Sequence, residues 1–217
     1  MDQNRRALEW VLSMYRQGWF PMCDEESGRV QWVQPHQRGI IPLDERFVVS
    51  RSLRQAVKSA KFEVTSDEAF VDVIEACAAP AKGREQTWLS DEIIDAFCVL
   101  HEHGLAHSLE VWAKEPRRLL GGLYGVCLGS VFCGESMFSR PESGGTNASK
   151  VALVHLVAHL GARGFTLLDS QLENEHLKQF GCFAMPREEY VKHLAGHAKD
   201  GVTWGEFDVS RAMQLVG

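Results

Sequence analysis

The sequence predicts an α+β protein, with a small N-terminal α/β domain over residues 1–61 and a main domain over residues 62–217. Three strand-like segments follow one another at hairpin spacing, which is typical of an antiparallel meander. A long segment with apolar residues at helical spacing comes next, and a short apolar run follows it. Helical segments bounded by capping residues lie on both sides of this block.

The small domain is expected to begin with a helix. Residues 4–17 carry apolar side chains on one helical stripe, whereas residues 19–47 combine Pro, Gly and short apolar runs that favour short strands and turns. Ser50 is expected to cap a further helix at residues 51–60, because a serine hydroxyl accepts a hydrogen bond from a free N–H of the first turn.

The main domain alternates between helices and strands. The expected elements are, in chain order, a strand at residues 61–65, a helix at 67–78 capped by Ser66, a helix from Ser90 to Gly104, strands at 107–114, 119–128 and 130–138, a helix at 148–163 capped by Asn147, a strand at 165–169, and helices at 173–180 and 187–197. The long helix would form a crossover between strands. This is the element order of the acyl-CoA N-acyltransferase (GNAT-type) architecture, although a fold alone assigns no function.

The charge of the chain is unevenly distributed. A formal net charge of −6 over 217 residues excludes a broadly basic nucleic-acid-binding surface. Residues 1–61 nevertheless hold ten Lys and Arg against seven Asp and Glu, and the other residues hold 13 against 22. Within the basic part, Arg51, Arg54 and Lys58 share one helix face, which suits either plain solvation or contact with a phosphate backbone.

Other classes of protein are not expected. No apolar run approaches the roughly 20 residues of a membrane span, and the N-terminus has no secretory signal. The six cysteines form no CxxC pair, which indicates buried thiols in a reducing cytoplasm. His155 and His159 lack the glutamate of HExxH and a third ligand, so we expect a surface or second-layer pair and no metal.

Three polar residues stand in apolar surroundings. Glu135 lies in the run Cys-Gly-Glu-Ser-Met-Phe, where a carboxylate needs a partner or a cleft. The same run lacks the second glycine of a GxSxG nucleophile elbow, so a serine hydrolase is not expected. Asp169 and Gln171 follow an apolar strand and would point to the same side of the chain. They either enter the crevice at the strand end or cap a loop.

Two further patterns are open to two interpretations. The stripe of Leu153, Leu156, Val157 and Leu160 on the long helix is either ordinary core or, in part, the wall of an apolar pocket. The glycines of Gly121-Gly-Leu-Tyr-Gly125 lie inside a strand and more readily indicate a bulge or close backbone approach than a nucleotide-binding loop.

Several of these segments together resemble one family. They are Thr87-Trp-Leu, His107-Ser-Leu-Glu-Val-Trp, Gly121-Gly-Leu-Tyr-Gly-Val, Phe132-Cys-Gly-Glu-Ser-Met-Phe-Ser-Arg, Asn147-Ala-Ser-Lys and Leu168-Asp-Ser-Gln. The chain resembles leucyl/phenylalanyl-tRNA–protein transferase from about Met14 to about Leu194. The succession CGESMFSR, NASK and LDSQ carries the resemblance.

The resemblance implies a bacterial, cytoplasmic enzyme with a GNAT-like domain that uses no CoA. Such an enzyme moves Leu, Phe or Met from aminoacyl-tRNA to the α-amine of a protein that begins with Arg or Lys, and so creates an N-terminal degradation signal. No cofactor, metal or membrane is expected to take part, and the protein is expected to be a monomer.

The resemblance also implies roles for single residues. Asp169, Gln171 and Glu135 are expected to be catalytic: the first two orient the amine or the aminoacyl group, and Glu135 supports them or contacts the basic side chain of the acceptor. We expect Asp169→Ala and Glu135→Ala to reduce transfer with thermal melting nearly unchanged. The apolar pocket is expected to consist of Leu123, Phe132, Met137, Leu153, Leu156, Leu160 and Leu168. Contacts to the tRNA 3′ end or the aminoacyl group are expected from Tyr15, Trp88 and Arg140, and contacts to tRNA phosphates from Arg51, Arg54 and Lys58.

The chain departs from the family pattern in four places, which concern donor preference and tRNA affinity. Met22 replaces the Trp of an FPW segment, an upstream GGDLS segment is missing, residues 143–146 lengthen a loop, and leucines replace aromatic residues in the helix stripe. Two alternatives stay open, a CoA-dependent N-acyltransferase and a non-catalytic tRNA- or degron-binding module. The segment from Arg140 to Gly145 does not fit the pyrophosphate loop of the first.

Overall fold

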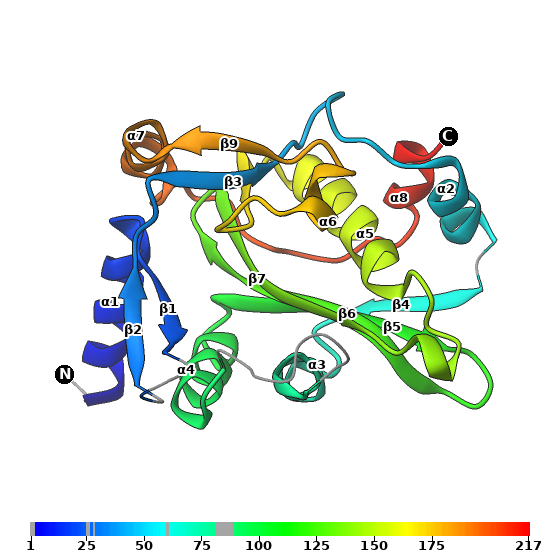
Figure 1. Ribbon diagram of the computed structural model, residues 1–217, viewed down its shortest axis with the longest axis horizontal. Coiled ribbons are helices and arrows are strands. Elements are labelled where there is room, and N and C mark those ends of the chain that lie inside the picture. The colour runs from blue at the N-terminus through cyan, green and yellow to red at the C-terminus, as the bar shows by residue number, and fades with distance from the viewer. Residues whose placement is uncertain (1–2, 25–26, 28, 60, 81–88) are drawn as a thin grey trace.

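The computed structural model describes residues 3–24, 27, 29–59, 61–80 and 89–217 (Figure 1). A seven-stranded sheet with the order β4-β5-β6-β7-β8-β3-β9 forms its centre. Among the described strand pairs of this sheet, β7 and β8 are parallel and the others are antiparallel. The strands are β3 (Gln37–Ile41), β4 (Phe62–Ser66), β5 (Ala106–Ala113), β6 (Arg118–Leu128), β7 (Val131–Ser139), β8 (Leu167–Asp169) and β9 (Phe183–Pro186).

The predicted meander and crossover are both present. Strands β5, β6 and β7 pair in sequence order, and α5 (Ala148–Arg163) connects β7 to the parallel strand β8. Helix α5 covers one face of the sheet together with α2 (Arg51–Lys58) and α8 (Arg211–Leu215), whereas α3 (Phe70–Ala78) and α4 (Asp91–Glu102) cover the other (Figure 1). Each face therefore has its own apolar core.

The N-terminal residues form a layer of their own and also join the large sheet. Helix α1 (Gln3–Arg16) lies beside the hairpin of β1 (Phe20–Cys23) and β2 (Val30–Val33), and it contacts α4 and α7 (Arg187–His197). Strand β3, which also precedes residue 61, lies between β8 and β9. The two parts of the chain thus share a sheet, and a domain boundary at residue 61 stays a prediction.

The predicted helix caps are confirmed only in part. The Ser50 hydroxyl accepts a hydrogen bond from the Leu53 N–H at 3.3 Å, as expected. The cap predicted at Ser66 is wrong, because Ser66 ends β4 and α3 begins at Phe70. Its hydroxyl instead donates to the Ser108 carbonyl and accepts from the Trp204 indole. Partners that are distant in sequence therefore outcompete the local cap.

The C-terminal segment packs on α5 and was not predicted. The Trp204 ring lies 4.4 Å from the His159 ring, and Phe207 lies beside both His155 and His159. Both histidines are therefore buried, which contradicts the surface arrangement but not the second-layer one of the two that were expected, and burial lowers the pKa of each to about 4. Strand β9 and α8 are further elements that the sequence pattern did not indicate, and α6 (Glu175–Lys178) is shorter than predicted.

Three findings concern the classes of site considered above. Cys98, Cys127, Cys133 and Cys182 are free thiols, and the Cys23 side chain lies outside the described part. Over the same residues, no group of three His, Cys, Asp or Glu side chains could hold a metal ion. No described helix combines the length and the apolar character that crossing a bilayer requires.

Candidate active site

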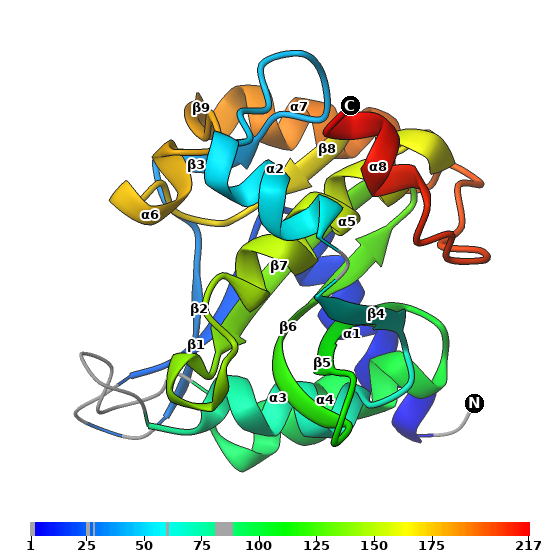
Figure 2. The same cartoon turned by 90° about the vertical axis from the view of Figure 1, so that its right-hand side faces the viewer.

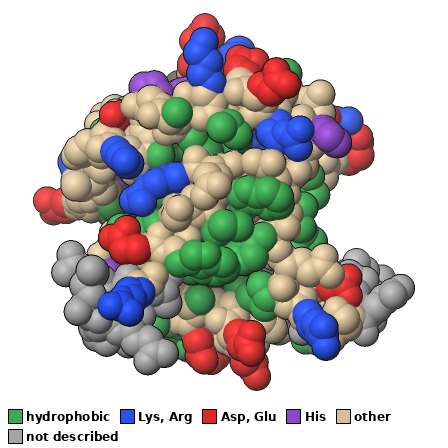
Figure 3. All heavy atoms as spheres, turned by 90° about the vertical axis from the view of Figure 1, so that its left-hand side faces the viewer, with side chains coloured by type: hydrophobic (Ala, Val, Ile, Leu, Met, Phe, Trp, Pro, Cys, Tyr) green, Lys and Arg blue, Asp and Glu red, His purple; other side chains and the backbone are tan. Residues whose placement is uncertain are grey.

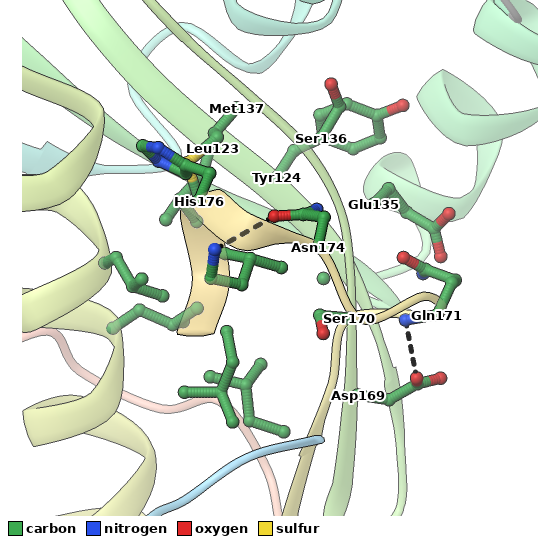
Figure 4. Close-up of a pocket in the computed structure, with 16 residues that line it drawn as sticks. Leu123, Tyr124, Glu135, Ser136, Met137, Asp169, Ser170, Gln171, Asn174 and His176 are labelled. Carbon is green, nitrogen blue, oxygen red and sulfur yellow. Dashed lines mark hydrogen bonds between the residues drawn. The ribbon is translucent and has the colours of Figure 1, made fainter. Parts of the chain in front are cut away.

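A cavity of about 220 Å³ lies between α5, the sheet and α6 (Figure 4). Its apolar wall comes from six elements: Ile41 of β3, Leu123 of β6, Met137 of β7, Leu153 and Leu156 of α5, Leu168 of β8 and Leu177 of α6. Its polar lining is Glu135, Ser136, Asp169, Ser170, Gln171, Asn174 and His176. An apolar recess that ends at a few polar groups is the usual form of a ligand site.

A β-bulge places Glu135 at this cavity. Tyr124 of β6 pairs with Ser136 of β7, but the next residue, Gly125, pairs with Gly134, so Glu135 has no partner on β6. The extra residue shifts the alternation of β7, and both Phe132 and Met137 consequently face α5. Bulges next to functional sites commonly re-aim a side chain. Gly125 is required here because a Cβ atom would lie 2.3 Å from the Cys133 carbonyl oxygen.

The Glu135 carboxyl is half-buried and has one hydrogen-bonding partner among the described side chains. The Tyr15 hydroxyl donates to Glu135 Oε1 at 2.9 Å. Burial is the main cause that raises the pKa of Glu135 to about 8; the Tyr15 hydrogen bond and the Arg38 charge lower it, and the Asp169 charge raises it. With this pKa the carboxyl is mostly protonated at pH 7, and a nearby cation would favour its ionisation.

The Asp169 carboxylate is fully occupied by other protein groups. Arg38 donates from Nε to Oδ1 at 2.8 Å and from Nη2 to Oδ2 at 2.7 Å, and the Tyr190 hydroxyl donates to Oδ2 at 2.7 Å. The Arg38 side chain is 2% exposed and that of Asp169 is 0% exposed. Burial disfavours the charged guanidinium, but the Asp169 carboxylate outweighs this effect and raises the pKa of Arg38. The two side chains thus form a bidentate salt bridge that is closed to solvent.

Gln171 is held in an uncommon backbone conformation by Asp169. Its φ is +57°, in the left-handed region, and its N–H donates to Asp169 Oδ1 at 2.8 Å. The side chain lies at the same end of the cavity as Glu135 (Figure 4). Among the described residues, no group accepts a hydrogen bond from its buried Nε2. A buried donor without an acceptor lowers the stability of the folded protein, unless a ligand accepts a hydrogen bond from it.

The predicted apolar pocket is largely assembled. Leu123, Met137, Leu153, Leu156 and Leu168 line the cavity. Phe132 and Leu160, predicted for the same wall, are not among its lining residues and are fully buried in the core behind it, where Phe132 stacks on Trp204 at 5.4 Å. Helical spacing placed Leu160 on the correct face of α5 but could not show how far along the helix the cavity extends.

The other predicted contacts lie outside this cavity. The Tyr15 side chain is buried and reaches the site only through its bond to Glu135. Arg140 is exposed, donates to the Leu119 carbonyl at 2.9 Å and lies over the Phe138 ring. Trp88 lies outside the described residues. Arg51, Arg54 and Lys58 are all exposed on α2, which packs against α5. Their roles remain predictions.

The sequence analysis missed Arg38, Tyr190, Asn174 and His176. Arg38 directly precedes the buried run Gly-Ile-Ile of β3, so a charge next to an apolar strand was the available signal. Its guanidinium lies between the rings of Phe20 and Tyr190, at 4.7 and 4.6 Å from their centres. Asn174 and His176 belong to a polar segment around α6 that has no distinguishing pattern.

A second, larger cavity of about 410 Å³ lies between α1, the β1–β2 hairpin and α4. It is lined by apolar and aromatic side chains, including Trp10 and Trp32, and Glu92 is its one ionisable lining residue other than Tyr15. Figure 3 shows hydrophobic side chains gathered over the middle of the face that carries α1 and the hairpin. Size alone does not make it a reaction centre, because the groups suited to acid–base chemistry surround the smaller cavity.

Comparison with known proteins shows the family of this chain. A sequence model of the leucyl/phenylalanyl-tRNA protein transferase family matches residues 40–195, which include Glu135, Asp169 and Gln171. This chain belongs to that family. Relatives named leucyl/phenylalanyl-tRNA–protein transferase include one from Phenylobacterium zucineum, 52% identical over 85% of this chain and 80% of its own, and one from Chlorobaculum parvum, 46% identical over 86% of this chain and 93% of its own.

A more distant solved structure is similar to this chain in fold. The crystal structure of FemX matches with a TM-score of 0.59 at 12% sequence identity, over 78% of this chain and 63% of the FemX chain. At this identity the match concerns the fold alone. The chain spans less than two thirds of FemX, and its own fold is a mixed α/β one with a mixed seven-stranded sheet.

Proposed function

We propose that the protein transfers a hydrophobic amino acid, Leu, Phe or Met, from aminoacyl-tRNA to the N-terminal Arg or Lys of an acceptor protein. The family and its named relatives support the reaction. The observation that carries the proposal is the cavity itself, in which a leucine-lined recess ends at a carboxyl and an unused amide. The recess suits an apolar side chain, and the polar end suits an ester and an amine.

The two substrates would meet at Glu135 and Gln171. The donor side chain fills the recess between Leu123, Leu153 and Leu156. The cationic side chain of the acceptor lies near Glu135, which also borders a smaller cavity of about 160 Å³ next to Met22 and Leu172. Binding of the cation ionises Glu135, because an opposite charge stabilises the carboxylate.

The reaction is aminolysis of an ester. The neutral α-amine, with an ordinary pKa of about 8, attacks the carbonyl carbon; the C–O bond to the tRNA ribose breaks, an amide bond forms, and the amine proton leaves with the ribose oxygen. Gln171 Nε2 donates to the carbonyl oxygen on which negative charge develops. Because the ester is already activated, holding both groups in place supplies much of the acceleration.

Asp169 would act by positioning rather than by touching the reacting atoms. Its oxygens are taken by Arg38, Tyr190 and the Gln171 N–H, and the carboxylate has no exposed surface. This arrangement fixes the left-handed turn at Gln171 and aims the amide into the cavity. Arg38 and Tyr190 are therefore part of the same positioning unit.

Several wider expectations belong to the same proposal. The succession of strands β4 to β8 with the α5 crossover supports a GNAT-like fold for residues 62–217. The product would carry an N-terminal degradation signal, and the enzyme would act in the cytoplasm as a monomer without a cofactor. Tyr15, Trp88 and Arg140 remain candidates for contacts near the tRNA 3′ end, with Arg51, Arg54 and Lys58 for tRNA phosphates.

A transfer assay tests the reaction directly. Purified protein is incubated with tRNA charged with Leu, Phe or Met and with peptides that differ only in the first residue, Arg, Lys or Ala. We expect mass spectrometry to show one added residue on the Arg and Lys peptides and none on the Ala peptide.

The same assay contains its controls. Acetylation of the acceptor N-terminus should abolish transfer, because no free amine remains. Failure to modify any peptide with any of the three charged tRNAs would overturn the proposed reaction, whereas acetylation of the same peptides from acetyl-CoA would favour a CoA-dependent enzyme instead.

A further inference from the structure

Lys150 carries a positive charge that the proposed chemistry does not use. It lies in the first turn of α5, within the segment Asn147-Ala-Ser-Lys. Its Nζ donates to Gln179 Oε1 at 2.8 Å, and no carboxylate of the described residues lies within ion-pair distance. Lys178, only one residue before Gln179, differs in this respect, because it pairs with Glu173 at 3.1 Å and Glu175 at 2.7 Å.

The Lys150 charge acts at the edge of the leucine-lined cavity. Gln179 Nε2 donates to the His176 carbonyl at 2.6 Å and lies 3.5 Å from His176 Nδ1, and His176 lines the cavity. Burial lowers the pKa of His176, and the nearby Lys150 charge lowers it further. Lys150, Gln179 and His176 therefore form a continuous group, which we call the cavity rim, with one uncompensated charge.

The position of the cavity rim suits the part of the donor that cannot enter the recess. If the proposed function holds, the amino-acid side chain occupies the recess and the ester lies near Gln171. The terminal nucleotide must then leave the cavity, and its phosphodiester carries the first negative charge outside it. Helix α2, on which Arg51 and Lys58 are exposed, packs on α5 and lies on the same side of the molecule as α5 and α6 (Figure 2).

We propose that the cavity rim binds a phosphodiester of the 3′-terminal nucleotides of the donor tRNA, with Lys150 as the charged contact. This inference rests on the proposed function and adds a substrate-binding residue to it. The rim brings the Lys150 charge to the edge of the recess, and α2, which packs on α5, carries further exposed cations. A lysine can bind phosphate as a point charge with several donors.

Donors of increasing length separate this role from others. We compare 3′-O-leucyl-adenosine, which has no phosphate, leucyl-cytidylyl-adenosine, which has one phosphodiester, and leucyl-tRNA. For Lys150→Gln we expect KM to rise roughly five- to tenfold with the last two donors and to stay unchanged with leucyl-adenosine, with kcat nearly constant. With leucyl-tRNA the slope of log KM against log salt should fall by about 1.

Two matched variants serve as controls. Lys178→Gln removes a neighbouring lysine that is already paired with carboxylates, and it should leave KM unchanged for all three donors. Lys150→Arg keeps the charge and should retain most of the affinity for the phosphate-bearing donors. A Lys150→Gln effect of equal size with leucyl-adenosine would overturn the proposal, because it would show that Lys150 shapes the cavity.

A binding measurement separates failure of this inference from failure of the proposed reaction. Calorimetry with uncharged cytidylyl-adenosine should show weaker binding to Lys150→Gln than to the wild type. If the wild type transfers leucine from leucyl-adenosine but both proteins bind the dinucleotide equally, the rim is not a phosphate site. If no donor is used but the binding difference persists, the rim is confirmed and the proposed reaction is wrong.

Discussion

Replacing Asp169 by Asn tests whether this residue positions Gln171 within a buried ion pair. Asn has the same shape but no charge, so it leaves the Arg38 guanidinium buried beside a neutral group. The side chains are 0% and 2% exposed and form a bidentate pair with distances of 2.7 and 2.8 Å. Breaking a buried pair by removing one partner typically costs about 3–5 kcal/mol. For a chain of this size that corresponds to roughly 6–20 °C in melting temperature.

Chemical unfolding and transfer kinetics on the same samples measure both consequences. We expect Asp169→Asn to lose stability by that amount and to lower kcat more than it raises KM for the donor, because Gln171 is no longer held in its left-handed turn. This expectation replaces the one derived from sequence, in which Asp169→Ala leaves thermal melting nearly unchanged. The difference arises because sequence could not reveal the Arg38 partner.

The chain offers a matched control for this experiment. Arg46 and Asp44 form an equally short bidentate pair, with an N–O distance of 2.7 Å, but their side chains are 61% and 41% exposed. Asp44→Asn should therefore cost less than about 1 kcal/mol. If Asp169→Asn melts like Asp44→Asn and still abolishes transfer, the positioning argument is refuted and a direct chemical role for Asp169 follows.

Three further predictions concern the substrates. Tyr15→Phe removes a hydrogen bond that stabilises ionised Glu135, so the pKa of Glu135 should rise above about 8. The pH at which the Arg peptide begins to bind well should therefore move upward. Measuring KM for the acceptor between pH 6 and pH 9 tests this, and an unchanged pH profile would contradict it. Binding of the Arg peptide to the wild type at pH 7 should release a proton, visible as calorimetric heats that depend on the ionisation enthalpy of the buffer, and Glu135→Gln should abolish this dependence. Leu156→Phe should fill part of the recess. When the two charged tRNAs compete, transfer of Phe should then fall roughly tenfold or more relative to transfer of Leu. This change would be absent if the donor side chain bound elsewhere.

Local sequence patterns predicted most helices and strands correctly for a physical reason. Apolar spacing reports which face of an element is buried, and this holds for the long helix α5 and for the three strands of the meander. It also placed Leu153 and Leu156 on the face that lines the cavity. The elements that were missed, β9 and α8, are short and have weak patterns of their own, so packing against β3 and α5 decides their structure.

The chemistry of the site depends on contacts between residues that are far apart in the chain. Glu135 could be recognised as an unusual carboxylate in an apolar run, but its partner Tyr15 lies 120 positions away, and a one-residue bulge in β7 aims it at the cavity. Arg38 and Asp169 are separated by 131 positions and meet because β3 pairs with β8. Periodicity carries information about local burial, whereas strand order, register and ion pairing arise only when the sheet assembles. The sequence therefore indicated Glu135, Asp169 and Gln171 as candidate site residues. The tertiary structure decided which side chains touch the cavity and which hold the others in place.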